Sequence, residues 1–272
     1  MLKKDKPFTL IDTHAGAGIY SLDDERALQT GETADGILKL MSSTLTTAEE
    51  GQDSLFLPQV PDSLKPYLSL VNLYIKENRY PGSPEIMRSF LRKEDRLLLM
   101  ELHNNEIEVL KTNMKRGCLG LRNRDENQKY GGFDKRIGIH HRNAYEGLKA
   151  LCPPTPRRGV LLMDPSYEID EDYESVARSL VDCHKRWSVG IVMLWYPLLK
   201  HRETELAIMK SAIKDAAFLS KSEVLVRELL IDNPDKEMGL YGSGMLIVNP
   251  PWHLDEQLTE VISFIEPLLK IF

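Results

Sequence analysis

One apolar run of this 272-residue chain ends in residues that could do chemistry: Gly159-Val-Leu-Leu-Met-Asp-Pro-Ser-Tyr-Glu168. An acid, a proline and an aromatic ring at a strand end suit methylation of an exocyclic amine. Such an amine is a weak nucleophile, because its lone pair is delocalised into the base. The Asp164 carboxylate and the Pro165 backbone carbonyl could accept its two hydrogens and localise the lone pair, while Tyr167 stacks on the base. For this tetrapeptide alone, a buried strand that ends in an Asp-Pro turn is the simpler interpretation.

A second candidate is the turn Asp12-Thr-His-Ala-Gly-Ala-Gly18, which follows the first apolar run. Small residues such as Gly16 and Gly18 after a parallel strand let the backbone approach a ligand closely. The spacing is neither the GxGxxG of nicotinamide dinucleotide sites nor the GxxxxGK[ST] of phosphate loops. A tight strand-to-helix turn is the alternative interpretation of these glycines.

Two further polar positions follow predicted strands. Glu101 ends the run Leu-Leu-Leu-Met-Glu, where an acid could accept hydrogen bonds from both hydroxyls of a ribose, or cap a helix. Asn143-Ala144 follows the next strand, and the amide could face an adenine. These signals support one another, because the carboxyl ends of parallel strands meet at one edge of the sheet. That edge would suit S-adenosylmethionine (SAM) beside a flipped, amine-bearing base.

Short apolar runs alternate with longer helical patterns, which predicts an α/β fold with a mostly parallel sheet covered on both faces. The predicted strands are 8–12, 96–101, 137–140, 159–164, 190–195, 223–231 and 244–249. The predicted helices are 83–92, 105–114, 172–185 and 203–217. Some eighty residues separate the first two strands, so we interpret residues 40–80 as a small helical insertion within a single domain 1–272.

The composition is that of an ordinary globular protein, with 42% hydrophobic and 28% charged residues. The net charge of −6 argues against a broadly basic nucleic-acid binder, so any such contact must be local. One candidate is the stretch 111–142, which holds nine Lys/Arg against three acids, although a solvated loop explains it equally well. Three scattered cysteines and the adjacent pair His140-His141 indicate neither disulfides nor a metal site. We therefore expect no metal.

The N-terminal apolar run is interrupted and too short for a signal peptide, and no segment approaches the length of a membrane span. We expect a cytoplasmic protein that does not bind a membrane.

Taken together, these motifs resemble the RlmJ family of SAM-dependent methyltransferases, which methylate adenine N6 in large-subunit ribosomal RNA. The resemblance spans nearly the whole chain. It rests on Asp12-Thr-His-Ala-Gly-Ala-Gly18, Tyr80-Pro-Gly-Ser-Pro84, Glu101-Leu-His103, Arg157-Arg-Gly159, Asp164-Pro-x-Tyr-Glu168, Leu194-Trp-Tyr-Pro197, Ser243-Gly-Met245 and Asn249-Pro-Pro-Trp252. It implies a Rossmann-like fold with an antiparallel last strand. It also places His14, Ser83, Glu101, Asn143 and Asp164 on SAM-contacting positions, with Asp164 catalytic.

The chain departs from the family at two site positions. Ser166 stands where the family has a second proline, and Asn143 stands where it has an aspartate. Family members also carry an N-terminal segment ahead of the first strand that contributes to the cofactor and substrate sites, so we expect activity to depend on whether the protein has it.

The resulting hypothesis is N6-methylation of an adenine in large-subunit ribosomal RNA by a monomer that uses SAM. A DNA adenine methyltransferase would use the same Asp-Pro-x-Tyr chemistry. A catalytically impaired protein that binds SAM or nucleic acid is the alternative from another class, and relatives of the family are linked to catabolism of external DNA.

Overall fold

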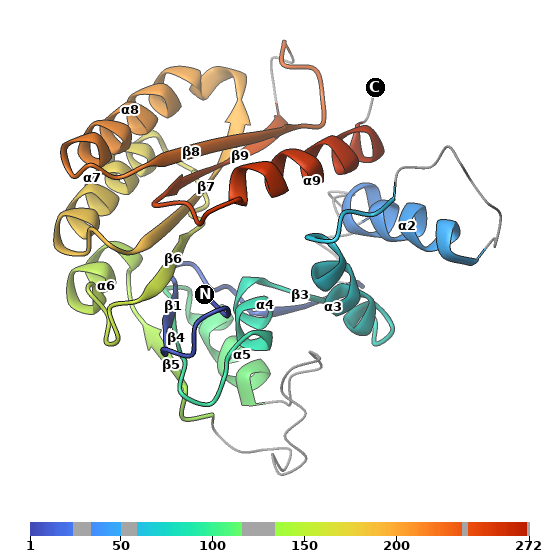
Figure 1. Cartoon of the computed structure of the whole chain (residues 1–272), viewed down its shortest axis with the longest axis horizontal. Coiled ribbons are helices and arrows are strands. Elements are labelled where there is room, and N and C mark those ends of the chain that lie inside the picture. Colours follow the sequence, from blue (N-terminus) through green and yellow to red (C-terminus); the bar gives the residue numbers. More distant parts are fainter. Residues whose placement is uncertain (24–33, 50–58, 116–133, 236–238, 271–272) are drawn as a thin grey trace.

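The computed structural model describes residues 1–23, 34–49, 59–115, 134–235 and 239–270, which form a seven-stranded sheet in the order β5-β4-β1-β6-β7-β9-β8 (Figure 1). Its strands are β1 (Thr9–Asp12), β4 (Arg96–Glu101), β5 (Ile137–His141), β6 (Gly159–Met163), β7 (Ile191–Leu199), β8 (Val224–Leu230) and β9 (Leu240–Val248). Strands β5, β4, β1, β6 and β7 run parallel, and β9 is antiparallel to both β7 and β8. This confirms the predicted sheet with its antiparallel last strand.

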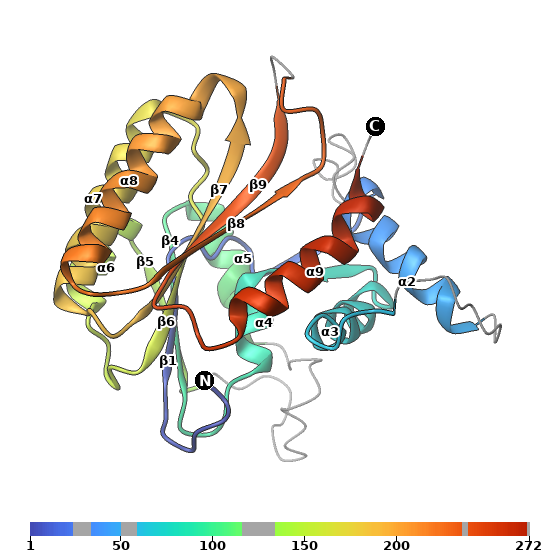
Figure 2. The ribbon, with the colours of Figure 1, turned by 45° about the horizontal axis from the view of Figure 1, so that its top comes forward.

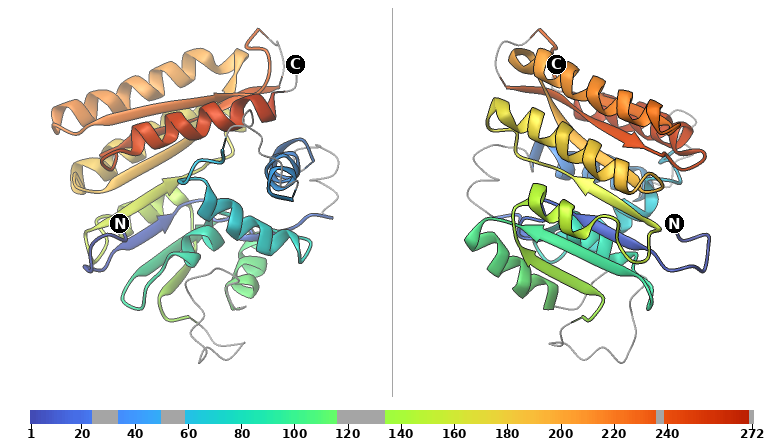
Figure 3. Two further views of the ribbon diagram at one scale, coloured as in Figure 1. Left: turned by 45° about the vertical axis from the view of Figure 1, so that its right-hand side comes forward. Right: turned by 90° about the vertical axis from the view of Figure 1, so that its left-hand side faces the viewer.

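Helices cover both faces of the sheet (Figures 2 and 3). One face carries α6 (Ala144–Leu151), α7 (Asp170–Arg186) and α8 (Glu203–Leu219); the other carries α4 (Ser83–Ser89), α5 (Asn104–Lys115) and α9 (Leu254–Leu269). Side chains alternate between the faces with the period of two that strands impose. Ile11 of β1 packs in the cluster of α7 and α8, whereas Leu10 of β1 and Phe8 just before it pack in the cluster of α5.

Two helices lie in the region predicted as an insertion, α2 (Lys39–Glu49) and α3 (Lys65–Ile75), with a short π-helical segment Ala34–Leu38 before them. Their apolar side chains, including Leu40 and Val71, pack with Phe264 and Leu268 of α9 at the side of the sheet (Figure 1). A two-stranded ribbon of β2 (Ile19–Ser21) and β3 (Arg79–Pro81) leads into and out of this region. The division into one domain with a 40–80 subdomain stays a prediction.

Across the ranges that the structure describes, no helix combines the length and the apolar character needed to cross a membrane.

Candidate active site

The carboxyl ends of three adjacent strands bring three acids together. Asp12 ends β1, opposite Leu99 of β4 and Leu162 of β6, so Glu101 and Asp164 each lie two residues further along the neighbouring strands. Because Ile11, Met100 and Met163 all pack on the α7 and α8 side, alternation places all three acids on the opposite side, toward α4. Asp12 therefore forms the floor of a site that Glu101 and Asp164 flank.

Asp12 is completely buried, and its environment disfavours its charge. Burial raises the pKa of Asp12 to about 7, with smaller contributions from the charges of Asp164 and Glu101. Hydrogen bonds from the Ser83 hydroxyl and from the His14 backbone N–H, 3.2 Å from Oδ1, act against this rise. Its other oxygen, Oδ2, is buried and has no hydrogen-bond partner in the described part of the protein. An orphaned acceptor of this kind is costly unless a ligand supplies a donor.

Asp164 lies immediately after β6, at the carboxyl end of that strand. Its side chain is exposed at the sheet edge, yet partial desolvation by its surroundings raises the pKa of Asp164 to about 6. Pro165 is buried, and Ser166 is exposed. The structure thus presents Asp164 at the edge where an incoming amine could meet it.

Tyr167 does not lie open to a base in this structure. Its side chain is 5% exposed, and its hydroxyl donates to the Trp195 carbonyl at 2.9 Å. Its ring packs against those of Tyr173 and Trp195, with centroids 4.7 and 6.3 Å away. The backbone of Tyr167 is left-handed, with φ +54°, an uncommon conformation outside glycine. Stacking on a substrate base stays a prediction, and it requires the loop to rearrange.

Glu101 joins two loops at this edge. Its Oε2 accepts from the Gly16 backbone N–H at 2.8 Å, and its Oε1 accepts from the His103 N–H at 2.7 Å. A carboxylate offers about four lone-pair sites, so acceptor capacity remains for ribose hydroxyls. Gly16 has φ +55°, and a Cβ there would lie 2.2 Å from the Tyr20 hydroxyl. The left-handed backbone favours glycine here, whereas the Tyr20 hydroxyl is the end of a side chain that could move.

Gly18 packs closely against α5. A Cβ at Gly18 would lie 2.8 Å from Leu110 of α5, and its carbonyl accepts from the Gly82 N–H at 2.9 Å. Gly82 is the N-cap of α4, so this bond fixes the helix start that carries Ser83.

A buried polar cluster holds α4 in place from the other side. The Tyr74 hydroxyl of α3 donates to Glu85, and Arg88 pairs with Glu85 at 2.5 Å. Arg88 also donates to the Met114 carbonyl at 2.9 Å. The cluster links the inserted helix α3 to α4 and α5, and so to the position of Ser83.

Asn143 and Ala144 follow β5, at the carboxyl end of that strand, and Asn143 has a structural role there. Asn143 is the N-cap of α6, and its Oδ1 accepts from the N–H groups of Tyr145 (2.9 Å) and Glu146 (3.3 Å). Contact of its side-chain NH₂ with an adenine stays a prediction. Ala144 is buried behind it. His14 meets the Tyr145 ring edge-on at 6.4 Å, and burial lowers the pKa of His14 to about 4, which keeps the imidazole neutral at physiological pH.

Two aromatic residues from the motifs that carry the family resemblance, Tyr196 and Trp252, lie away from this site. Tyr196 is buried and donates to Glu228 at 2.9 Å, so it belongs to the core. The loop after β9 lies at the opposite edge, since Asn249 donates to the Ser188 and Gly190 carbonyls, both at 2.8 Å; Trp252 therefore cannot wall this site. Most of the basic stretch 111–142 falls in 116–133, outside the described residues. No cluster of three or more potential metal ligands occurs in the described ranges.

The residue that sequence reasoning missed is Asp12. Its signal was an acid at the end of a strand whose other residues are apolar or small, Thr9-Leu-Ile-Asp12. With it, the edge combines a buried acceptor without a donor, acceptor capacity on Glu101 and an exposed carboxylate. Such a set can bind a cationic, hydroxyl-bearing cofactor and hold an amine beside it.

The chain is similar to known proteins over nearly its whole length. The family model for "Ribosomal RNA large subunit methyltransferase D, RlmJ" matches residues 5–270. The chain is 34% identical to ribosomal RNA large subunit methyltransferase J of Escherichia coli and 30% identical to that of Haemophilus influenzae. Each match covers 98% of this chain, with 84% and 83% of the relatives. A crystal structure of a Legionella pneumophila protein superimposes with a TM-score of 0.74 at 28% identity, covering 98% of this chain and 86% of the other.

Proposed function

The chain belongs to the RlmJ family of ribosomal RNA large-subunit methyltransferases, and from this premise we propose that it methylates N6 of an adenine in that RNA, using SAM. The observation that supports this most directly is the edge formed by Asp12, Glu101 and Asp164. There the exposed carboxylate of Asp164 lies close enough to the buried Asp12 for its charge to raise the pKa of Asp12, whose Oδ2 has no donor in the described part of the protein.

The residues at this edge fit the cofactor. When bound, SAM supplies a methyl group on a cationic sulfonium. The partnerless Oδ2 of Asp12 is an acceptor suited to the cofactor's cationic end, and Glu101 keeps acceptor capacity for the ribose hydroxyls. Asn143 would donate its NH₂ to the adenine, because its oxygen already caps α6. The Ser83 hydroxyl and the His14 N–H, which donate to Asp12, lie beside the proposed cofactor position.

Asp164 and Pro165 act on the amine. The ionised carboxylate accepts one N–H hydrogen and the Pro165 carbonyl accepts the other, which localises the lone pair on the nitrogen. The amine gains the methyl group and loses one proton, and Asp164 is placed to take that proton. Its pKa of about 6 keeps it mostly ionised at neutral pH. Positioning and fixed charges supply the rest of the acceleration.

Stacking by Tyr167 is part of the proposal. The loop must release the hydroxyl from the Trp195 carbonyl so that the ring can face the base. The left-handed backbone of Tyr167 is an uncommon conformation that binding energy of the RNA could change, at the cost of the contacts that its hydroxyl and its ring make.

The direct test uses unmodified large-subunit ribosomal RNA and SAM with a labelled methyl group. We expect N6-methyladenosine in the digested RNA, identified by mass spectrometry. A matched deoxyribo-oligonucleotide tests the DNA alternative, and methylation of DNA alone would replace this proposal. Tight SAM binding without transfer to either polymer would support a catalytically impaired protein. The proposed monomer is checked separately by light scattering.

A further inference from the structure

The edge of the sheet opposite the acids is basic. It consists of the segments that lead into β1, β4, β5, β6 and β7, namely residues 1–8, 92–96, 134–136, 152–158 and 184–190; we call it the amino edge. Its basic residues are Lys3, Lys4, Lys6, Arg92, Lys93, Arg96, Lys135, Arg136, Arg157, Arg158, Lys185 and Arg186. Its acids are Asp5, Glu94, Asp95 and Asp134. In a chain of net charge −6, this excess of positive charge is a local property.

Backbone hydrogen bonds join these segments into one surface. The Arg96 N–H donates to the Phe8 carbonyl at 3.0 Å, and the Leu97 N–H donates to the Arg136 carbonyl at 2.9 Å. On the other side of β1, the Thr9 N–H donates to the Arg158 carbonyl at 2.9 Å. Residues that are far apart in the sequence therefore present their side chains side by side.

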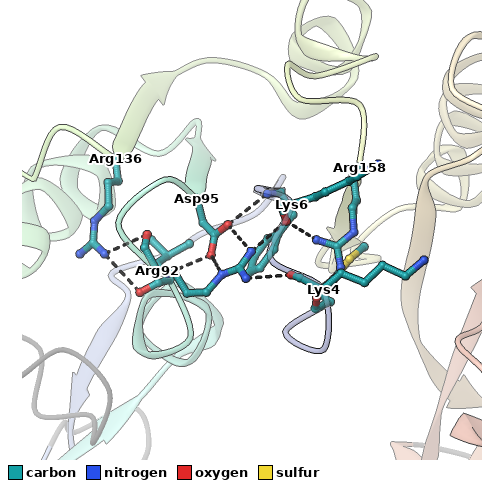
Figure 4. Close-up of polar contacts among 9 residues, drawn as sticks. Lys4, Lys6, Arg92, Asp95, Arg136 and Arg158 are labelled. Carbon is teal, nitrogen blue, oxygen red and sulfur yellow. Dashed lines mark hydrogen bonds and ion pairs between the residues drawn. The ribbon is translucent and has the colours of Figure 1, made fainter.

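Arg158 is held in place by neutral groups (Figure 4). It donates to the Lys6 carbonyl at 2.6 Å, and its guanidinium group lies over the Phe8 ring, 5.7 Å from the centroid. Carbonyls and rings fix a guanidinium without cancelling its charge. Arg92 and Arg136 are paired with Asp95 and Asp134 instead. The positive potential of this surface therefore comes from Arg158 and from the lysines and arginines in excess of its acids.

The carboxyl edge has the opposite composition. The segments around the strand ends, 12–23, 101–106, 141–146, 164–172 and 199–205, carry acids at Asp12, Asp23, Glu101, Glu106, Glu146, Asp164, Glu168, Asp170, Glu171, Asp172, Glu203 and Glu205. Their basic residues are Arg142, Lys200 and Arg202. This edge attracts a cationic cofactor but repels phosphates, so affinity for a polyanion must arise elsewhere on the molecule.

We propose that the amino edge binds the phosphate backbone of the same RNA whose adenine enters the carboxyl edge. The inference rests on the proposed function, because it concerns the RNA substrate. The six residues of β4 span about 20 Å, so one folded RNA can contact both edges, whereas a few nucleotides around the target base cannot. Trp252, 87% exposed on a loop at the amino edge, adds a ring on which a base can stack.

The test compares two charge reversals of equal size. Lys93→Glu/Lys135→Glu changes exposed lysines at the amino edge, and Lys76→Glu/Lys214→Glu changes exposed lysines on α3's end and on α8. The probe is in vitro transcribed large-subunit ribosomal RNA, titrated by filter binding at several salt concentrations. For the amino-edge pair we expect Kd to rise about tenfold or more and the salt slope to fall by about 2. For the control pair we expect less than a twofold change in Kd.

SAM affinity should be unchanged in both variants, and the amino-edge variant should show a raised KM for RNA with an unchanged kcat. Equal weakening by both pairs, or no weakening by the amino-edge pair, overturns the inference. Its failure is distinct from failure of the proposed function. If the wild-type protein methylates RNA, and the Lys93→Glu/Lys135→Glu variant binds RNA with the same salt dependence as the wild type, only the amino-edge contact is refuted. A protein that does not methylate RNA, but whose RNA binding still depends on these lysines, refutes only the activity.

Discussion

Two buried carboxylates, Asp12 and Asp95, lie at opposite edges of the same sheet and are treated in opposite ways. Asp95, 1% exposed, accepts from the Phe8 N–H at 3.1 Å, from the Arg92 N–H at 2.9 Å and from Arg92 Nε at 2.8 Å. Burial alone would raise the pKa of Asp95, but these hydrogen bonds lower it overall. Asp12, 0% exposed, has an oxygen without a donor and a pKa raised to about 7.

The difference separates an acid that stabilises the fold from one that the fold tolerates. The donors that stabilise the charge of Asp95 all come from the protein itself. These hydrogen bonds join the N-terminal segment to the turn before β4. Asp12 accepts hydrogen bonds from Ser83 and from the His14 N–H, but its Oδ2 has no donor in the described part of the protein, so a ligand that brings one stabilises its charged form further. The pair therefore distinguishes a structural carboxylate from a binding carboxylate on geometric grounds.

The largest expected effect concerns the exposed member of the carboxyl edge. Asp164→Asn keeps the shape but replaces a proton-accepting oxygen with an NH₂ group, so methyl transfer to ribosomal RNA should fall by about 10²–10³-fold. SAM binding, measured by calorimetry, should stay within about twofold, because the proposed partners of the cofactor are mainly Asp12 and Glu101. Glu168→Gln, an exposed acid nearby, is the matched control. Wild-type turnover by Asp164→Asn would show that this edge does not hold the amine.

A smaller effect tests the structural acid. Asp95→Asn leaves Arg92 without a charged partner and should lower the free energy of unfolding by about 2–4 kcal/mol. Because the folded-state pKa of Asp95 is depressed, its contribution is present above the unfolded pKa and lost as the pH falls through the folded value. Urea unfolding at neutral and acidic pH measures both. Glu94→Gln, its exposed neighbour, should change stability by less than about 0.5 kcal/mol. Equal effects of the two substitutions would contradict the structural role of Asp95.

The smallest effect has the opposite sign. Asp12→Asn removes a buried charge and should raise the free energy of unfolding by an amount on the order of 1–2 kcal/mol at about pH 8. The folded-state pKa of Asp12 lies above its unfolded value, so its contribution to stability is fully present below about pH 4 and lost as the pH rises through about 7. The gain should therefore disappear in acid.

The same variant should bind SAM about tenfold more weakly at neutral pH. A substitution that destabilises the protein at about pH 8, or that leaves SAM affinity unchanged, would show that Asp12 and Asp95 do not differ in the way described.

The main sheet was predictable because burial on both faces requires apolar runs, and all seven predicted strands occur. The ribbon of β2 and β3 was not predicted, because three-residue strands leave no periodic pattern. Helices α6 and α9 were also missed. The first has eight residues, and the second contains Pro267 and buries its apolar face against α2 and α3, which a single-sequence pattern cannot anticipate.

The candidate site was predictable in outline and not in its contacts. Placement of Glu101 and Asp164 followed from strand ends, but the burial of Tyr167 against Trp195 depends on tertiary packing. The amino edge could not be seen at all, since its basic residues come from five separate segments that only the sheet register brings together. The basic stretch that the sequence did indicate, 111–142, lies mostly outside these segments.

The hydrogen bond from Gly82 to Gly18 and the buried Glu85 cluster limit how this chain can be shortened. The residues between β2 and β3 look expendable, since they leave the sheet and return to it. Yet Tyr74 on α3 donates to Glu85 of α4, and α4 positions Ser83, whose hydroxyl donates to Asp12. Replacing the region with a short linker would withdraw that donor and leave Glu85 and Arg88 in the interior. A minimal methyltransferase core must therefore keep α3, and the natural place for a graft or a tag is further out, toward α2.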